Sequence, residues 1–91
     1  MAGVMLITGG GRGIGAATAR LAAARGYAVC INYLRDRASA ESVVQDIRAD
    51  GGSAIAVPGD VAQEKDVVHL FEACDRSLGP LSALVDRKSV V

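Results

Sequence analysis

The residues of this chain with the most specific chemical potential form a glycine-rich run, Thr8–Gly15, with the sequence TGGGRGIG. The run directly follows an apolar stretch and directly precedes an alanine-rich helical pattern. Glycines allow positive φ and let a phosphate approach the backbone with no Cβ in the way. The free N–H groups and the positive end of the following helix would then face the anion. The run therefore predicts a turn that binds the pyrophosphate of a dinucleotide.

The elements that must position this turn alternate between strand and helix along the whole chain. Apolar runs predict strands at residues 3–8, 28–33, 54–57 and 81–85. Helices are expected at residues 14–25, between a cap at Asp36 or Ser39 and a stop at residues 50–52, and at residues 63–78. This βαβαβαβ order predicts parallel strands, right-handed crossovers and helices on both faces. We expect an α/β fold, a Rossmann-like doubly wound parallel sheet that is incomplete.

Helical spacing also predicts which side chains face the core. On the second helix the apolar positions fall at i, i+3, i+4 and i+7, namely Ala40, Val43, Val44 and Ile47. On the third helix the expected inner face consists of Val67, Leu70, Phe71, Cys74 and Leu78. His69 lies between Val68 and Leu70, both expected in the core, and we interpret it as a surface or packing residue with no catalytic role.

Three landmarks, in order, resemble the short-chain dehydrogenase/reductase family. They are the glycine turn, the pair Asp60-Val61 after the third strand, and residues 80–85, which resemble the lead-in to that family's Asn-Asn-Ala-Gly motif. The resemblance implies a doubly wound sheet and oxidation of alcohols or reduction of carbonyls with a nicotinamide cofactor. It implies a sugar dehydrogenase-like or 3-oxoacyl reductase-like enzyme that forms homo-oligomers. The implied cofactor-binding residues are Thr8, Gly9, Gly11, Arg12, Gly13, Ile14, Gly15, Asn32, Tyr33, Arg35, Asp60 and Val61.

Some of these residues have a second interpretation. Thr8 could position the glycine turn through its hydroxyl, or could be a strand residue of high β propensity. Asp60 could contact adenine, cap the third helix, or do both. Asn32 is expected on the adenosine side of the cofactor.

The end of the second strand bears on the choice between NAD and NADP. An acidic side chain there would bond the ribose hydroxyls and repel a 2′-phosphate. In this chain Tyr33 occupies the position that is usually acidic in the family, and we expect the first acid, Asp36, to start a helix. Arg12 and Arg35 could make charge-assisted contacts with a 2′-phosphate. The pattern favours NADP over NAD, although both arginines could also be solvated surface charges.

Composition excludes several other classes of protein. Ten basic and ten acidic residues balance, so no basic face indicates nucleic acid. No apolar run is long enough for a membrane span, and no secretory signal is visible. Cys30 and Cys74 fall in apolar patterns without metal-ligand spacing, which is typical of buried, reduced thiols in a cytoplasmic protein. We expect no metal site, no nucleic-acid partner and no membrane partner.

The proton-transfer groups of the family have no counterpart in these residues, so we assign no catalytic residue. The family uses a Ser, a Tyr-x-x-x-Lys pair and an Asn, whereas neither Tyr27 nor Tyr33 has a lysine four residues later. Residues 1–85 are interpreted as the N-terminal part of a dinucleotide-binding domain. Residues 86–91 are interpreted as a non-native end, whose codons fit a sequencing adapter. The alternative is a natural truncation or a frameshifted gene. A non-catalytic NADP(H)-binding regulatory module and an inert fragment are the alternative functions.

Overall fold

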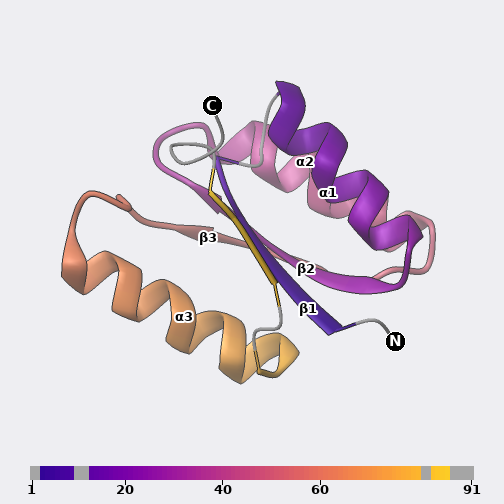
Figure 1. Cartoon of the computed structure of the whole chain (residues 1–91). Coiled ribbons are helices and arrows are strands. Elements are labelled where there is room, and N and C mark those ends of the chain that lie inside the picture. The colour runs from indigo at the N-terminus through magenta and orange to yellow at the C-terminus, as the bar shows by residue number, and fades with distance from the viewer. Residues whose placement is uncertain (1–2, 10–12, 81–82, 87–91) are drawn as a thin grey trace.

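The computed structural model describes residues 3–9, 13–80 and 83–86 of the 91-residue chain. Strands and helices alternate along it, as predicted (Figure 1). The strands are β1 (Gly3–Thr8), β2 (Tyr27–Tyr33), β3 (Ala54–Pro58) and β4 (Ala83–Asp86). The helices are α1 (Gly13–Ala24), α2 (Arg37–Ala49) and α3 (Glu64–Leu78).

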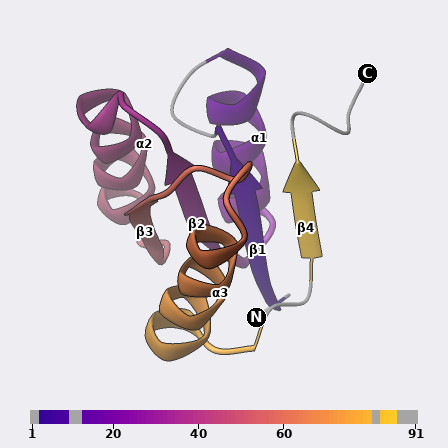
Figure 2. The same ribbon diagram turned by 90° about the vertical axis from the view of Figure 1, so that its left-hand side faces the viewer.

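The four strands form one parallel sheet in the order β3-β2-β1-β4. Helices α1 and α2 lie on one face of this sheet and α3 lies on the other (Figures 1 and 2). The chain thus moves outward from β1 to β3, then returns through α3 to place β4 beside β1. The order of strands reverses between β1 and β4, which is where doubly wound sheets open a binding crevice at the strands' carboxyl ends.

The register brings polar residues together at this carboxyl edge. Thr8 at the end of β1 pairs with Asn32 of β2 on one side and with Asp86 of β4 on the other. Asn32 in turn pairs with Val57 of β3. Strand β4 therefore extends to Asp86, one residue beyond the predicted boundary at Val85, and residues 87–91 lie outside the described part.

The sheet separates two apolar layers. Between the sheet and the α1–α2 pair, small alanines of α1 let that helix sit close to the strands, and the predicted inner face of α2 is confirmed as buried. On the other face, Leu70 and Cys74 of α3 pack against Cys30 and Leu6 of the sheet. Both cysteines are buried, as expected.

The predicted inner face of α3 was too wide. Leu70 and Cys74 are buried, but Phe71 is 38% exposed and Val68 is 52% exposed. A single helix touches a sheet along a narrow stripe of i, i+4 positions, and Phe71 is rotated about 100° from Leu70 around the helix axis. The prediction is therefore wrong for Phe71 and Val68, whereas His69 lies on the surface as expected.

Candidate functional site

The glycine turn joins the end of β1 to the start of α1. Gly9 follows β1 with φ of 63°, and Gly13 begins α1 with φ of 53°, a backbone region that disfavours other residues. A Cβ built on Gly13 would meet no atom within 4 Å, so the space beside this turn is open. Gly11 and Arg12, both predicted to bind the cofactor, belong to residues 10–12, which lie outside the described part.

The first turn of α1 suits an anion. Its residues Gly13, Ile14 and Gly15 carry no acidic side chain, so no carboxylate competes for the positive end of the helix. The Ile14 side chain is 74% exposed, and its carbonyl accepts a hydrogen bond from the Thr18 hydroxyl at 2.8 Å. What Ile14 can offer a ligand is thus its main-chain N–H.

A cleft of about 250 Å³ lies at the carboxyl ends of β1, β2 and β3. It contains five of the residues predicted from sequence, which come from the end of β1 and the turn after it, from the end of β2, and from the loop between β3 and α3. Leu34 and Gly59 also line it, and sequence analysis missed both. Their only signal was their position just after a strand. The lining residues are Thr8, Gly9, Asn32, Leu34, Gly59, Asp60 and Val61.

Tyr33 and Arg35 do not line this cleft. Side chains alternate across a strand, so Asn32 faces the α3 side and Tyr33 faces the α1–α2 side, where it packs against the core as a partly buried residue. Arg35 follows β2 and is exposed. Both residues stand at the carboxyl edge, beside the cleft.

Asn32 joins the ends of β2 and β3. Its side chain is buried, and its Nδ2 group donates to the Gly59 carbonyl at 3.0 Å and to the Val57 carbonyl at 3.4 Å. Only the NH₂ group of the amide can donate to two carbonyl oxygens, which fixes the orientation of this side chain. In return the Gly59 N–H donates to the Tyr33 carbonyl at 3.0 Å. Asn32 therefore builds a wall of the cleft through its amide hydrogens.

Asp60 lies in the turn between β3 and α3. Its Oδ1 accepts the Ala62 N–H at 2.9 Å, its carbonyl accepts the Gln63 N–H at 2.9 Å, and its own N–H donates to the Asp66 carboxylate at 2.9 Å. The N-cap of α3 is Gln63, which makes no side-chain cap bond. The interpretation of Asp60 as the cap of the third helix is wrong, because the tight turn at residues 60–63 separates Asp60 from the first helical residue.

The acid nearest the end of β2 belongs to a helix cap. Asp36 is the N-cap of α2, and its carboxylate accepts from the Ser39 N–H at 3.0 Å and from the Ser39 hydroxyl at 2.7 Å. Of the two caps that the sequence allows, the structure has Asp36 as the N-cap, and Ser39 is the residue that bonds its carboxylate. The Asp36 carboxylate is thus committed to starting α2.

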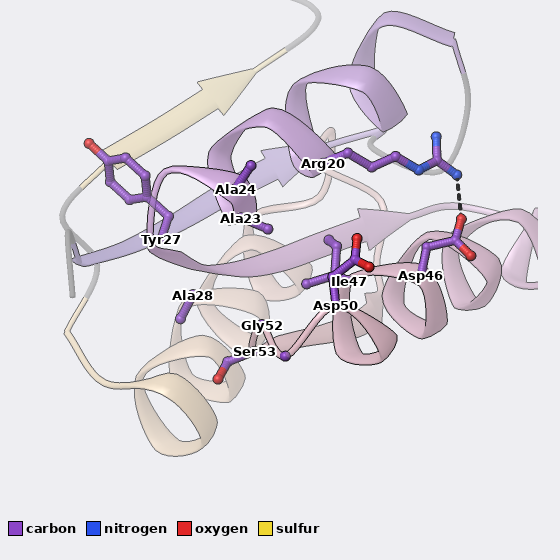
Figure 3. Close-up of a pocket in the computed structure, with 12 residues that line it drawn as sticks. Arg20, Ala23, Ala24, Tyr27, Ala28, Asp46, Ile47, Asp50, Gly52 and Ser53 are labelled. Atoms are coloured by element: carbon purple, nitrogen blue, oxygen red, sulfur yellow. Dashed lines mark hydrogen bonds and ion pairs between the residues drawn. The ribbon is translucent and has the colours of Figure 1, made fainter.

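A larger hollow of about 500 Å³ lies at the opposite end of the sheet (Figure 3). It is bounded by the last turns of α1 and α2, and the Arg20 guanidinium bonds the Asp46 carboxylate across it at 2.8 Å. Helices present carbonyl groups and a negative dipole at their C-terminal ends. This hollow is therefore unsuited to a pyrophosphate, unlike the cleft beside the start of α1.

Three further observations bear on the kind of site. Burial raises the pKa of both the Cys30 and the Cys74 thiol, so neither is a ready nucleophile. Among the described residues, no three His, Cys, Asp or Glu side chains gather as metal ligands would. Nor does any helix in this part of the chain have the length and apolar character needed to cross a membrane.

An open parallel sheet with a glycine turn and a cleft at its carboxyl edge is typical of nucleotide-binding α/β proteins. The chain belongs to the short chain dehydrogenase family, whose family model matches residues 3–88. This confirms the resemblance seen in the sequence.

Individual relatives agree with this assignment. The chain is 41% identical over 88 residues to the uncharacterized oxidoreductase YgfF of Escherichia coli strain K12, covering 97% of this chain and 36% of that protein. A crystal structure of a short chain dehydrogenase from Burkholderia cenocepacia in complex with NADP is 38% identical, with TM-score 0.87, over 92% of this chain and 34% of that one. A blue fluorescent protein from a metagenomic library, solved in complex with NADPH, is 36% identical with TM-score 0.85, over 89% of this chain and 34% of that one. This chain spans about a third of the length of these proteins.

Proposed function

We propose that this chain is the cofactor-binding part of an NADP-dependent oxidoreductase. The observation that carries the proposal is the cleft at the carboxyl ends of β1–β3, which places the glycine turn next to the Asp60-Val61 loop. The open space at Gly13 and the acid-free first turn of α1 fit a pyrophosphate. Across the cleft, Asp60 and Val61 fit an adenine ring. Two of the similar solved structures hold NADP or NADPH.

Preference for NADP over NAD is supported by the end of β2. The Asp36 carboxylate is bonded to Ser39, and Tyr33 stands where the family usually has an acid. Arg35 is exposed at the same edge of the sheet, and its guanidinium is proposed as one cationic contact with a 2′-phosphate. Arg12, inside the glycine turn, is proposed as the second cationic contact.

When bound, the nicotinamide group supplies or accepts a hydride. The residues of this chain bind and orient the dinucleotide, while proton transfer to a small carbonyl or from an alcohol needs groups that residues 1–91 do not contain. The complete enzyme is proposed to be a cytoplasmic homo-oligomer. The free, buried cysteines fit a reducing compartment.

Calorimetric titration of the chain with NADPH and with NADH tests the proposal. We expect NADPH to bind about tenfold tighter or more, as one charge-assisted contact with the 2′-phosphate would give. Tighter binding of NADH would overturn the choice of cofactor, and no binding of either dinucleotide would overturn the proposed function.

A further inference from the structure

The carboxylate of Asp66 holds the loop that faces the cleft. Asp66 is the third residue of α3, and its Oδ2 accepts the main-chain N–H of Asp60 at 2.9 Å. A carboxylate at this helical position commonly bonds the N–H of the N-cap residue. Here it instead reaches past the N-cap, Gln63, to a residue on the far side of the turn.

This contact completes the immobilisation of Asp60. The Asp60 carbonyl is held by the Gln63 N–H and its Oδ1 by the Ala62 N–H, so Asp66 supplies the third fixed point. Within residues 13–80, the Asp60 Oδ2 and the Val61 N–H make no hydrogen bond to the protein. Both residues line the cleft. The turn thus presents one acceptor and one donor side by side.

An acceptor next to a donor matches one edge of adenine. The N6 amino group of adenine donates and its N1 accepts, whereas hypoxanthine presents an accepting O6 and a donating N1–H. A site built to bond a particular donor discriminates against an analogue that lacks it, because its own polar group is left unpaired. How well the site distinguishes the two bases therefore depends on how firmly the carboxylate of Asp60 is held in position.

We propose that Asp66 is a positioning residue for base recognition, which fixes Asp60 and Val61 so that this site distinguishes adenine from hypoxanthine. The inference rests on the proposed function, since it requires that the cleft bind the adenosine half of a dinucleotide. Asp66 itself lies behind the turn and is not assigned a contact with the base.

The test compares the affinities of the full chain for NADPH and for its hypoxanthine counterpart, nicotinamide hypoxanthine dinucleotide phosphate in reduced form. Asp66→Ala should lower the preference for adenine about tenfold, which corresponds to losing one hydrogen bond to the base, while affinity for the hypoxanthine form changes by no more than about twofold. Asp66→Asn keeps an oxygen that can accept the Asp60 N–H, and should retain the preference. Glu64→Ala, which removes another carboxylate from the first turn of α3, is the matched control and should also retain it.

The outcomes separate the two proposals. If the unaltered chain binds neither dinucleotide, the proposed function fails and the inference fails with it. If the chain binds NADPH but Asp66→Ala weakens both dinucleotides equally, Asp66 is merely structural and the inference alone is overturned. If Asp66→Ala does not unfold cooperatively, Asp66→Ser replaces it, because its hydroxyl is one bond too short to reach the Asp60 N–H.

Discussion

The buried amide of Asn32 donates to the carbonyl of Gly59 at 3.0 Å, across the ends of two adjacent strands. A second bond from the same nitrogen reaches the Val57 carbonyl. These contacts tie β2 to the segment that leads into the Asp60 turn. The cleft wall is therefore part of the protein's interior hydrogen bonding, and substitutions there should change stability and binding together.

Asn32→Ala should lower the free energy of unfolding by about 1–3 kcal/mol, because it leaves two carbonyl groups without their donor. Asn32→Asp should cost more, since a carboxylate would face two carbonyl oxygens with no hydrogen to donate. Urea denaturation followed by circular dichroism measures both changes. Gln45→Ala, on the exposed surface of α2, is the control and should change the value by no more than about 0.5 kcal/mol. Equal stability of the Ala variant and the unaltered chain would contradict the assigned bonds.

Arg35→Ala should weaken NADPH binding by roughly 1.5 kcal/mol, about tenfold, while leaving NADH binding almost unchanged. Tyr33→Asp should move the preference toward NADH, because a carboxylate at the end of β2 bonds the ribose hydroxyls and repels a 2′-phosphate. Calorimetry with the two dinucleotides measures both effects. The matched control is Arg37→Ala, which removes a nearby exposed arginine that pairs with Glu41 on α2 at 3.5 Å. A similar loss of NADPH affinity in the control would mean that only general surface charge is involved.

Asp36→Ala should destabilise the protein by about 1 kcal/mol, because α2 loses the side chain that caps its N-terminus. Asp36→Asn should keep most of that stability, since Asn is a comparable N-cap. Asp50→Ala, at the other end of α2, removes a negative charge from the negative end of the helix dipole and should be neutral or slightly stabilising. Thermal denaturation of the three variants gives the comparison. The prediction fails if the Asp36→Ala and Asp50→Ala variants unfold at the same temperature.

The buried thiols should make stability fall at alkaline pH. Burial raises the pKa of Cys30 and Cys74 in the folded protein, so both stay protonated there while the unfolded chain loses these protons above about pH 8.5. The unfolded state then binds fewer protons, and the free energy of unfolding decreases by up to about 1.4 kcal/mol per pH unit for each thiol. Below about pH 8.5 the thiols contribute no pH dependence.

Urea denaturation between pH 7 and about pH 10 measures how stability depends on pH. The unaltered chain is compared with the double variant Cys30→Ala/Cys74→Ala. The variant should be less stable at pH 7, because it leaves a cavity between β2 and α3, yet its stability should decrease less steeply with pH. Parallel pH profiles would show that the thiols do not cause the alkaline loss. A thiol reagent should also react only with the unfolded chain.

The 91-residue chain should transfer no hydride by itself. It lacks the family's proton-transfer groups, and a general acid or base typically contributes about 10² to 10⁴ in rate. Absorbance of NADPH, followed with a panel of small aldehydes and ketones, should decay no faster than in a blank without protein. A rate above the blank that is abolished by Gly13→Val, which blocks the turn, would contradict this expectation.

The sequence by itself determined the class of fold. Its alternation of apolar runs and helical patterns placed every strand and helix of the described part to within a few residues. The flanking strand and helix also led to the prediction that Thr8–Gly15 forms a phosphate-binding turn. These features are local, because strand and helix periods and the backbone freedom of glycine act over neighbouring residues. The order of the elements then restricted the topology to a few arrangements.

Tertiary structure decided which candidate residues share the cleft and what each one does there. Asn32 and Gly59 are 27 positions apart, yet their bond depends on the β2–β3 register, which the chain pattern does not specify. The link from Asp66 to Asp60 depends on how the turn enters α3, and that geometry excluded Asp60 as the helix cap. The exposure of Phe71 likewise follows from the narrow contact of one helix with the sheet. Such contacts join residues distant in sequence, and only the packing of the layers brings them within bonding distance.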